Sequence, residues 1–186
     1  MILNKNKKPI IQRATWKKAA IFSALFGVFY ALINFSSVGV AGLLKITGGA
    51  SILDLEFGYS QEEAYQMLTA LGTAGRSFYL MKISPLDFLF PFTYMLCFAG
   101  WIALLIKQVT HRDRYKYLLL IPVLTMLFDW MENVNIIVML NGYPDLPAGA
   151  VFSASISGML KTVFTIGNII VMSVLFIIFS LKKMRG

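Results

Sequence analysis

The chain has 186 residues, of which 58% are hydrophobic and only 14% are charged, and its formal net charge at pH 7 is +8. Since about a quarter of the residues of an average soluble domain are charged, this composition excludes a water-soluble globule. The single cysteine, Cys97, excludes an internal disulfide framework, and the single histidine, His111, excludes a histidine-based zinc site or bis-histidine haem ligation. We therefore expect a membrane protein, and the sequence predicts no metal and no cofactor.

Four apolar stretches are long enough to cross a bilayer, whose hydrocarbon core of about 30 Å takes about 20 helical residues. They cover residues 19–44, 83–106, 117–140 and 162–181. Because backbone groups in lipid must be hydrogen-bonded within the segment, we expect these stretches to be helices. The chain 1–186 is thus predicted to form a single all-α membrane domain with four transmembrane helices, and residues 45–82 form an outer segment between the first two.

Basic residues gather on one side of the predicted spans. Thirteen of the 17 Lys and Arg residues precede the first stretch, lie between the second and third, or follow the fourth. The positive-inside rule therefore predicts that both termini are cytoplasmic. These charges are split over three short segments without interleaved aromatic residues, so we expect no nucleic-acid partner. Their expected partner is the lipid bilayer, through its anionic headgroups.

In the outer segment, Ser60 and Glu63 have the spacing of a capping box, in which the Ser60 hydroxyl and the Glu63 side chain each accept from the other residue's backbone amide. Apolar residues then recur at helical spacing, and Gly72 and Gly75 offer stop positions. The pattern predicts a short amphipathic helix of about three turns. This helix either lies on the membrane surface or caps the bundle. It is a connector that completes the fold or a lid over a ligand.

Three polar residues lie together in the third predicted span. Asp129 is twelve residues after Tyr117, which places it about 18 Å into the bilayer at 1.5 Å per residue. Glu132 and Asn133 follow at i+3 and i+4 and share its helix face. Because a charged side chain at a helix centre facing lipid costs about 2.5 to 3.5 kcal/mol on insertion scales, we expect this face to point into the protein. Asn135 points elsewhere, towards a neighbouring helix.

The other spans also carry polar residues at helical spacing, so that four polar stripes would meet in one bundle interior. Those of the first span are Ser23, Gly27, Tyr30, Asn34 and Ser37. Asp87, Glu132 and Lys161 lie in the outer halves of their spans, so an interior pocket is expected to open outward, with Asp129 as its floor. The predicted ligand-binding residues are Asp129, Glu132, Asn133, Asp87, Tyr94, Arg76, Lys161, Asn168 and Asn34.

Two carboxylates one helical turn apart cannot both be ionised cheaply in a low dielectric. One of Asp129 and Glu132 is therefore expected to hold a proton unless Lys161 or Arg76 compensates. Such a pair suits proton relay, cation binding or acid–base chemistry. The alternative is an interhelical hydrogen-bond network that only fixes the packing, at about 0.6 kcal/mol per contact. Lys161 is either a headgroup anchor or part of the site, and Arg76 either pairs with Asp87 or contacts lipid phosphate.

Several short motifs resemble a pattern in bacterial four-helix membrane proteins of unassigned activity. The motifs are Gly58-Tyr59-Ser60 with Glu62-Glu63-Ala64, Leu71-Gly72 with Gly75-Arg76, Asp87 with Phe90-Pro91 and Tyr94, and Asp129 with Glu132-Asn133. The resemblance covers about residues 58–165 and implies a protein of the bacterial inner membrane, without indicating its chemistry. The layout of four helices, a long first outer loop and buried carboxylates is also similar to the sterol-isomerase and sigma-2 receptor group. The isomerases of that group use an intramembrane histidine, which no span has here, so only a ligand-binding analogy follows.

The sequence leaves three functions open. The first is binding or transport of a small cationic or amphipathic molecule, including a lipid, against Asp129 and Glu132. The second is a membrane-embedded enzyme that uses the same pair as general acid and base on a lipid-like substrate, although the chain has no phosphate-binding loop, HExxH or GxSxG motif. The third is an accessory subunit without a ligand. Oligomerisation is also open.

Overall fold

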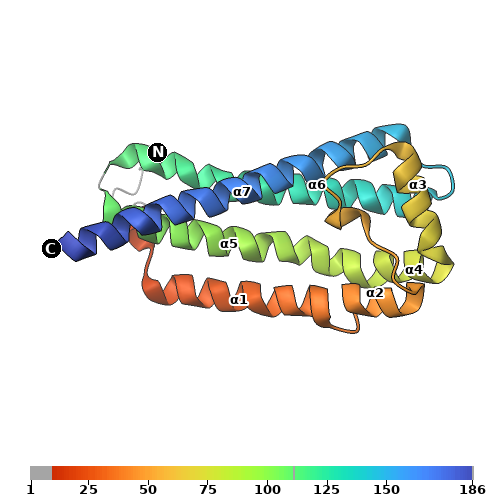
Figure 1. Ribbon diagram of the computed structural model, residues 1–186, viewed down its shortest axis with the longest axis horizontal. Helices are drawn as coiled ribbons and strands as arrows, with labels where there is room; N and C mark the ends of the chain where they lie inside the picture. Colours follow the sequence, from red (N-terminus) through yellow and green to blue (C-terminus); the bar gives the residue numbers. More distant parts are fainter. Residues whose placement is uncertain (1–9, 111, 186) are drawn as a thin grey trace, which may run out of the picture.

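The computed structural model describes residues 10–110 and 112–185, and within them all regular structure is helical (Figure 1). The α-helices are α1 (Trp16–Phe35), α2 (Val40–Thr47), α3 (Gln61–Ala70), α4 (Gly72–Phe78), α5 (Ser84–Val109), α6 (Leu120–Gly142) and α7 (Ala148–Arg185). Short 3-10 turns form η1 (Ile10–Arg13), η2 (Leu53–Leu55) and η4 (Asp113–Leu119), and η3 (Tyr79–Ile83) is a π-helical turn between α4 and α5. Lys5, Lys7, Lys8 and His111 lie outside the described residues.

Within residues 10–110 and 112–185, four helical segments are long and apolar enough to cross a membrane. They are Trp16–Thr47, Gly72–Val109, Arg114–Gly142 and Ala148–Arg185. Each contains one of the four stretches predicted from the sequence. The all-α class and the number of candidate spans are therefore confirmed.

Helix α5 is the central helix of the bundle. It packs against α1 on one side and against α6 and α7 on the other, and α6 and α7 pack extensively against each other. Figure 1 shows α2, α3 and α4 at one end of the bundle, which we call the capped end. The start of α1, the η4 connection and the end of α7 lie at the opposite end, where Lys107 and Lys182 donate to backbone carbonyls of Ala14 and Val109. We call it the basic end, because the described parts of the three basic segments meet there.

The first predicted span, 19–44, is not one continuous helix. Helix α1 ends at Phe35, and α2 begins at Val40 after a four-residue break. A Cβ atom on Gly39 would lie 2.1 Å from the Ile33 carbonyl oxygen, so only glycine lets the chain approach the end of α1 this closely. The Ser36 hydroxyl donates to the Leu32 carbonyl, which satisfies one of the carbonyls left free at the helix end.

Helix α7 begins at Ala148, fourteen residues before the predicted start of the fourth span at 162. Serines lower the hydropathy of this extra part, and two of them are hydrogen-bonded to other elements. The Ser153 hydroxyl accepts from the Asn135 amide group at 3.1 Å, and the Ser155 hydroxyl accepts from the Tyr59 backbone amide at 2.9 Å. The first of these bonds confirms that Asn135 points towards a neighbouring helix.

The capping box at the start of α3 is present as predicted. The Glu63 amide donates to the Ser60 hydroxyl at 3.3 Å, and the Ser60 amide donates to the Glu63 carboxylate at 2.7 Å. Helix α3 ends before Gly72, which has a left-handed φ of 62°. Ala64 and Leu68 are fully buried in the main apolar core, together with residues of α6 and α7. The outer helix therefore caps the bundle.

Candidate functional site

The polar face of α6 is buried in the bundle, as its sequence spacing predicts. The exposed fractions of Asp129, Glu132 and Asn133 are 5%, 0% and 3%. They occupy one side of α6, which faces α5 and α7, the two helices that pack against it. Since unpaired charges are costly inside a protein, the partners of these two carboxylates decide what the site can do.

Glu132 and Asp54 share one ammonium group. The Lys161 Nζ atom of α7 lies 2.7 Å from Glu132 Oε2 and 2.7 Å from Asp54 Oδ1. Asp54 belongs to η2 in the outer segment, which folds back so that the Asp54 side chain reaches α7. Lys161 therefore lies with the buried carboxylates, where it supplies the charge that Glu132 needs in a buried position.

Asp129 lies beside this ion pair but has different partners. Its carboxylate accepts from the Tyr94 hydroxyl at 2.8 Å and from the Asn133 side-chain amide at 3.0 Å. Asn133 also donates to the Asp87 backbone carbonyl at 3.0 Å, which fixes the amide between α5 and α6. Each oxygen of Asp129 thus has one neutral hydrogen-bond donor, and no ion pair with Asp129 occurs among the described residues.

Carboxylate oxygens of Asp54, Asp129 and Glu132 lie within 4.8 Å of one another. We call these three residues together with Lys161 the acidic cluster. Carboxylate oxygens are the ligands that hard divalent cations prefer, so in the described part of the chain these three residues could hold a metal ion. The Lys161 ammonium already contacts two of them, so a metal would have to displace it. With all groups ionised, the cluster carries three negative charges against one positive charge.

Helix α7 comes close to the cluster because of a glycine. A Cβ atom on Gly158 would lie 2.5 Å from Glu132 Oε1, so a larger residue would displace the carboxylate or the helix. Glu132 Oε1 and the Tyr59 hydroxyl are buried without a hydrogen-bond partner in the described residues. Burial raises the pKa of Tyr59 far above its ordinary value, and the nearby Glu132 charge adds to the effect. Tyr59 therefore stays neutral and keeps a proton to donate.

A cavity of about 340 Å³ adjoins the cluster. Asp54, Asp129 and Lys161 are the charged residues in its wall. The remaining lining residues are mostly aromatic or aliphatic: Phe26, Tyr30, Leu55, Phe90, Tyr94, Phe98, Thr162, Thr165 and Ile166. The cavity therefore combines a carboxylate with aromatic side chains from α1 and α5. We call it the aromatic pocket.

The aromatic pocket lies between α1 and α7. These helices meet at the basic end, where the Trp16 and Phe179 rings are 6.0 Å apart, but they do not pack along their lengths. The walls that they supply to the pocket are Phe26 and Tyr30 of α1 and the stretch from Lys161 to Ile166 of α7. The pocket therefore lies where α1 and α7 do not pack against each other.

Two predicted site residues lie away from the cluster. Arg76 donates to the Leu68 carbonyl at 2.8 Å, and its guanidinium carbon lies 3.8 Å from the centre of the Tyr143 ring. It does not pair with Asp87 among the described residues. Asn34 donates to the Tyr30 carbonyl of its own helix at 2.9 Å. Both predictions of a site role were based on polarity near a span, and nearby backbone carbonyls satisfy both side chains instead.

Asp87 and Asn168 lie beside the cluster. The side chain of Asp87 is buried, and its backbone carbonyl holds Asn133. Asn168 donates to the Thr125 hydroxyl at 2.8 Å, one turn before Asp129 on α6. Sequence reasoning missed Asp54, because it lies in the outer segment and not in a span. The available signal was an acid inside the short apolar run Ile52–Leu55, in which Ile52 and Leu53 are buried.

Comparison of the chain with protein-family models, curated proteins and solved structures gives no match. The functional argument therefore depends on the geometry of the acidic cluster and the aromatic pocket.

Proposed function

We propose that this chain is a multi-pass protein of the bacterial inner membrane, with both termini cytoplasmic, that binds or transports a small organic cation with an apolar part. The ligand places its cationic group against Asp129 and its apolar part in the aromatic pocket. Four apolar helices, the bacterial four-helix pattern in the sequence and the clustering of basic residues at one end support the location and orientation.

The observation that carries the proposal is the wall of the aromatic pocket. Asp129 lines it without an ion-pair partner among the described residues, close to the rings of Tyr94, Phe90 and Tyr30. Aromatic faces attract cations, and a buried carboxylate strengthens this preference because its charge is little screened. About 340 Å³ is near the lower end of the volumes of small-molecule pockets. The ligand is thus expected to be small.

The excess of carboxylates also favours a cation over an anion. Lys161 is held by Asp54 and Glu132, so it cannot serve an anionic ligand without breaking a buried pair. A cation beside Asp129 instead brings the cluster closer to neutrality. An amphipathic cation could reach this position from the lipid between α1 and α7, whereas the sequence predicts an outward opening. Residues 53–55 of η2 would lie next to an outward route, since Asp54 and Leu55 line the pocket.

The replacement Asp129→Asn tests the proposal, because it preserves the shape and removes the charge. A panel of primary and quaternary aromatic ammonium ions, with uncharged alcohols of the same shape, is added to detergent-purified protein, and the melting temperature is measured. At least one cation should stabilise the parent and lose about tenfold or more in affinity in the variant. Asp145→Asn is the matched control, because Asp145 is exposed outside the cluster. Equal responses of parent and Asp129→Asn across the panel would contradict the proposal and favour a packing role.

A membrane-embedded enzyme is the second candidate, because Asp129 and Lys161 line the same pocket and can accept and donate protons there. Incubation with a lipid extract, followed by mass spectrometry, separates the two functions. Products that form with the parent and not with Asp129→Asn would favour catalysis. A ligand that co-purifies unchanged would favour binding or transport.

Topology is tested separately. Reporter fusions after residues 60 and 145 should report the outside, and fusions after residues 112 and 186 should report the cytoplasm. A cytoplasmic signal from position 60 would overturn the orientation and the outward side of the pocket with it.

A further inference from the structure

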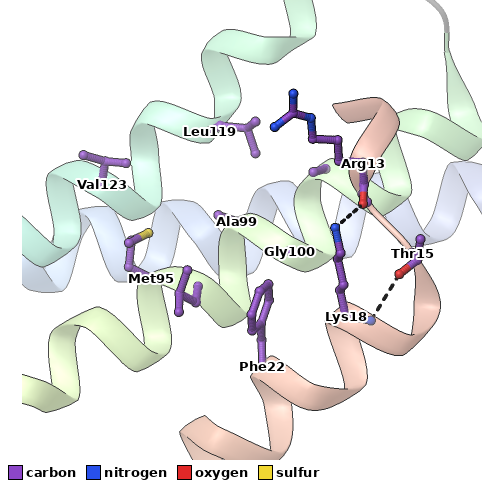
Figure 2. A pocket seen from close by; sticks show the side chains of 12 residues that line it. Arg13, Thr15, Lys18, Phe22, Met95, Ala99, Gly100, Leu119 and Val123 are labelled. Atoms are coloured by element: carbon purple, nitrogen blue, oxygen red, sulfur yellow. Dashed lines mark hydrogen bonds between the residues drawn. The ribbon is translucent and has the colours of Figure 1, made fainter. Parts of the chain in front are cut away.

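A second cavity lies at the basic end, away from the acidic cluster. It has a volume of about 440 Å³ and is lined by η1 and the first turns of α1, by α5, by the end of η4 and by the start of α6 (Figure 2). It shares no lining residue with the aromatic pocket. We call it the basal groove.

Small residues of α5 create the basal groove. Ala99, Gly100 and Ala103 face α1, and none of them fills the space between α5 and the neighbouring helices. A Cβ atom on Gly100 would lie 2.9 Å from Cδ2 of Phe22, so the ring comes as close to α5 as a glycine permits. The remaining apolar walls are Phe22 from α1, Met95 and Leu96 from α5, Leu119 from η4 and Val123 from α6.

The polar residues of the groove lie together at its end near η1. Figure 2 shows Arg13, Thr15 and Lys18 on one side of the view and Met95 and Val123 on the other. The Lys18 ammonium donates to the Arg13 carbonyl at 3.1 Å, so η1 holds it at the groove and leaves two of its protons for other acceptors. Arg13 and Lys18 are exposed, and none of the described residues that line the groove is acidic.

The inner end of the groove, at Met95, lies about one membrane leaflet away from the end of α5. Met95 is twelve residues from Lys107, the basic residue near the end of α5, which corresponds to about 18 Å along the helix. Half of a hydrocarbon core of about 30 Å is about 15 Å. An acyl chain that follows α5 from the basic end would therefore reach Met95 near the middle of the bilayer.

We propose that the basal groove binds one anionic phospholipid, with an acyl chain between α1, α5 and α6 and its phosphate group at Arg13 and Lys18. The charge at the groove end and the apolar walls below it complement the two parts of such a lipid. The proposal requires only that the four apolar helices lie in a membrane. It does not depend on the ligand of the aromatic pocket.

Native mass spectrometry of the full chain in detergent tests this site with dioleoyl-phosphatidylglycerol, dioleoyl-phosphatidylcholine and inorganic phosphate. The parent should retain one phosphatidylglycerol molecule in preference to phosphatidylcholine. Arg13→Gln and Lys18→Gln should each lower its affinity about fivefold, the effect expected of one basic residue near an anionic lipid. Lys17→Gln is the matched control, because Lys17 is exposed on the same helix turn but does not line the groove.

A second pair of variants tests the apolar wall. Ala99→Phe fills the groove and should also lower the affinity for phosphatidylglycerol, whereas Ala20→Phe, at an exposed position of α1, should not. If Ala99→Phe does not fold, the two charge variants still decide. Equal retention of both lipids would overturn the proposal, as would equal effects of Lys17→Gln and Lys18→Gln. Inorganic phosphate that binds as tightly as the lipid would show that the apolar groove contributes nothing, and would overturn it too.

Discussion

Helices α6 and α1 both carry polar residues at helical spacing, but those of α6 are buried in the bundle, whereas those of α1 stay partly or fully exposed. Asp129, Glu132 and Asn133 of α6 contact residues of α5 and α7. Helix α1 has only two buried residues, Ala19 and Ile33, and packs on the outside of α5. In the most apolar 18 residues of each candidate span, 44% are buried in the segment that contains α6 and 11% in the segment that contains α1.

The difference shows which polar residues require a helix to lie inside the bundle. A hydroxyl or amide group can be satisfied by a carbonyl of its own helix, as Asn34 is by Tyr30. A carboxylate cannot use a carbonyl in this way, since both are acceptors, so it requires donors or cations from other elements. An uncharged polar stripe is therefore compatible with a peripheral helix, whereas Asp129 and Glu132 require an interior position.

Removal of the shared cation is the strongest test of this difference. Lys161→Met leaves Glu132, which is fully buried, without its counter-charge, so we expect a loss of about 3 kcal/mol in the free energy of unfolding. This value is the lower end of the range for breaking a buried ion pair, because Asp54 is 18% exposed. Denaturation in detergent measures the loss. Lys82→Met is the control at an exposed lysine, and adding Glu132→Gln to Lys161→Met should restore part of the stability. A cost no larger than that of the control would mean that the ion pair does not hold α7.

The contact between α6 and α7 and the contact between α1 and α5 can also be compared, because each contains one closely packed glycine. Gly158→Ala places a methyl group 2.5 Å from Glu132 Oε1 and should cost about 1 to 3 kcal/mol. Gly100→Ala meets the Phe22 ring at 2.9 Å and Ala19 Cα at an ordinary 3.9 Å, and α1 can adjust because it is peripheral. The better helix propensity of alanine then offsets most of the strain, so that the net change should be below about 1 kcal/mol. Thermal unfolding of both variants under the same conditions checks the order. The reverse order would contradict the assignment of α1 as the more adaptable helix.

Helix α3, which covers the ends of α6 and α7, is tested by Ser60→Ala. This replacement should destabilise α3 by about 0.5 to 2 kcal/mol. Amide hydrogen exchange of residues 61–70 measures the loss, and membrane insertion should not change. The Ser60 amide holds the pKa of Glu63 below its ordinary value, and the Ser60 hydroxyl adds to the effect. The Glu63 contribution should thus be complete above about pH 4.5 and decline as the pH falls through the lower folded pKa.

Glu63→Gln is the control for this pH dependence, because glutamine can close the same capping box without a carboxylate. Its α3 amides should lose less protection than those of the parent when the pH is lowered. Identical pH profiles of parent and Glu63→Gln would show that the Glu63 charge does not stabilise the helix start.

The smallest effect is expected at the polar contact between α1 and α5. The Ser23 hydroxyl accepts from the Trp101 ring nitrogen at 2.8 Å and lies 3.6 Å from Cys97 Sγ. Ser23→Ala removes both contacts and should cost about 0.6 kcal/mol, the average for an interhelical hydrogen bond in a membrane protein. Unfolding in detergent measures it beside Lys161→Met. A loss as large as that of Lys161→Met would remove the contrast between the two helices.

Much of this architecture follows from local sequence rules. The four apolar stretches, the shared face of Asp129, Glu132 and Asn133, and the Ser60 capping box depend on residues within one helix, so spacing was sufficient to predict them. Asp54 and Arg76 depend on long-range folding. Asp54 contacts Lys161, which lies 107 positions later in the sequence. Arg76 of α4 stacks on Tyr143, which lies between α6 and α7. No local pattern encodes such pairs.

The predicted start of the fourth span, at residue 162, was too late for another reason. A hydropathy window detects solubility in lipid and not helix formation, so it stopped at Lys161. Ser153 and Ser155, which precede this residue, are compatible with a helix and are paired with other elements. The first span shows the opposite error: one continuous helix was predicted where there are two. The stretch through α2 stays apolar, although the helix breaks after Phe35 at the turn that contains Gly39.

The length of α7 has a mechanical consequence. Its 38 residues correspond to about 57 Å, and even at a tilt of about 40° they rise about 44 Å, well beyond a hydrocarbon core of about 30 Å. The basic residues from Lys182 onward hold the other end near the headgroups in the proposed topology, so the excess length projects from the membrane at Ala148. This projecting part packs against α3, and no proline interrupts the helix down to Lys161. A force or a binding partner that tilts the projecting part of α7 would therefore move the Lys161 ammonium relative to its two carboxylates, because the helix between them is uninterrupted.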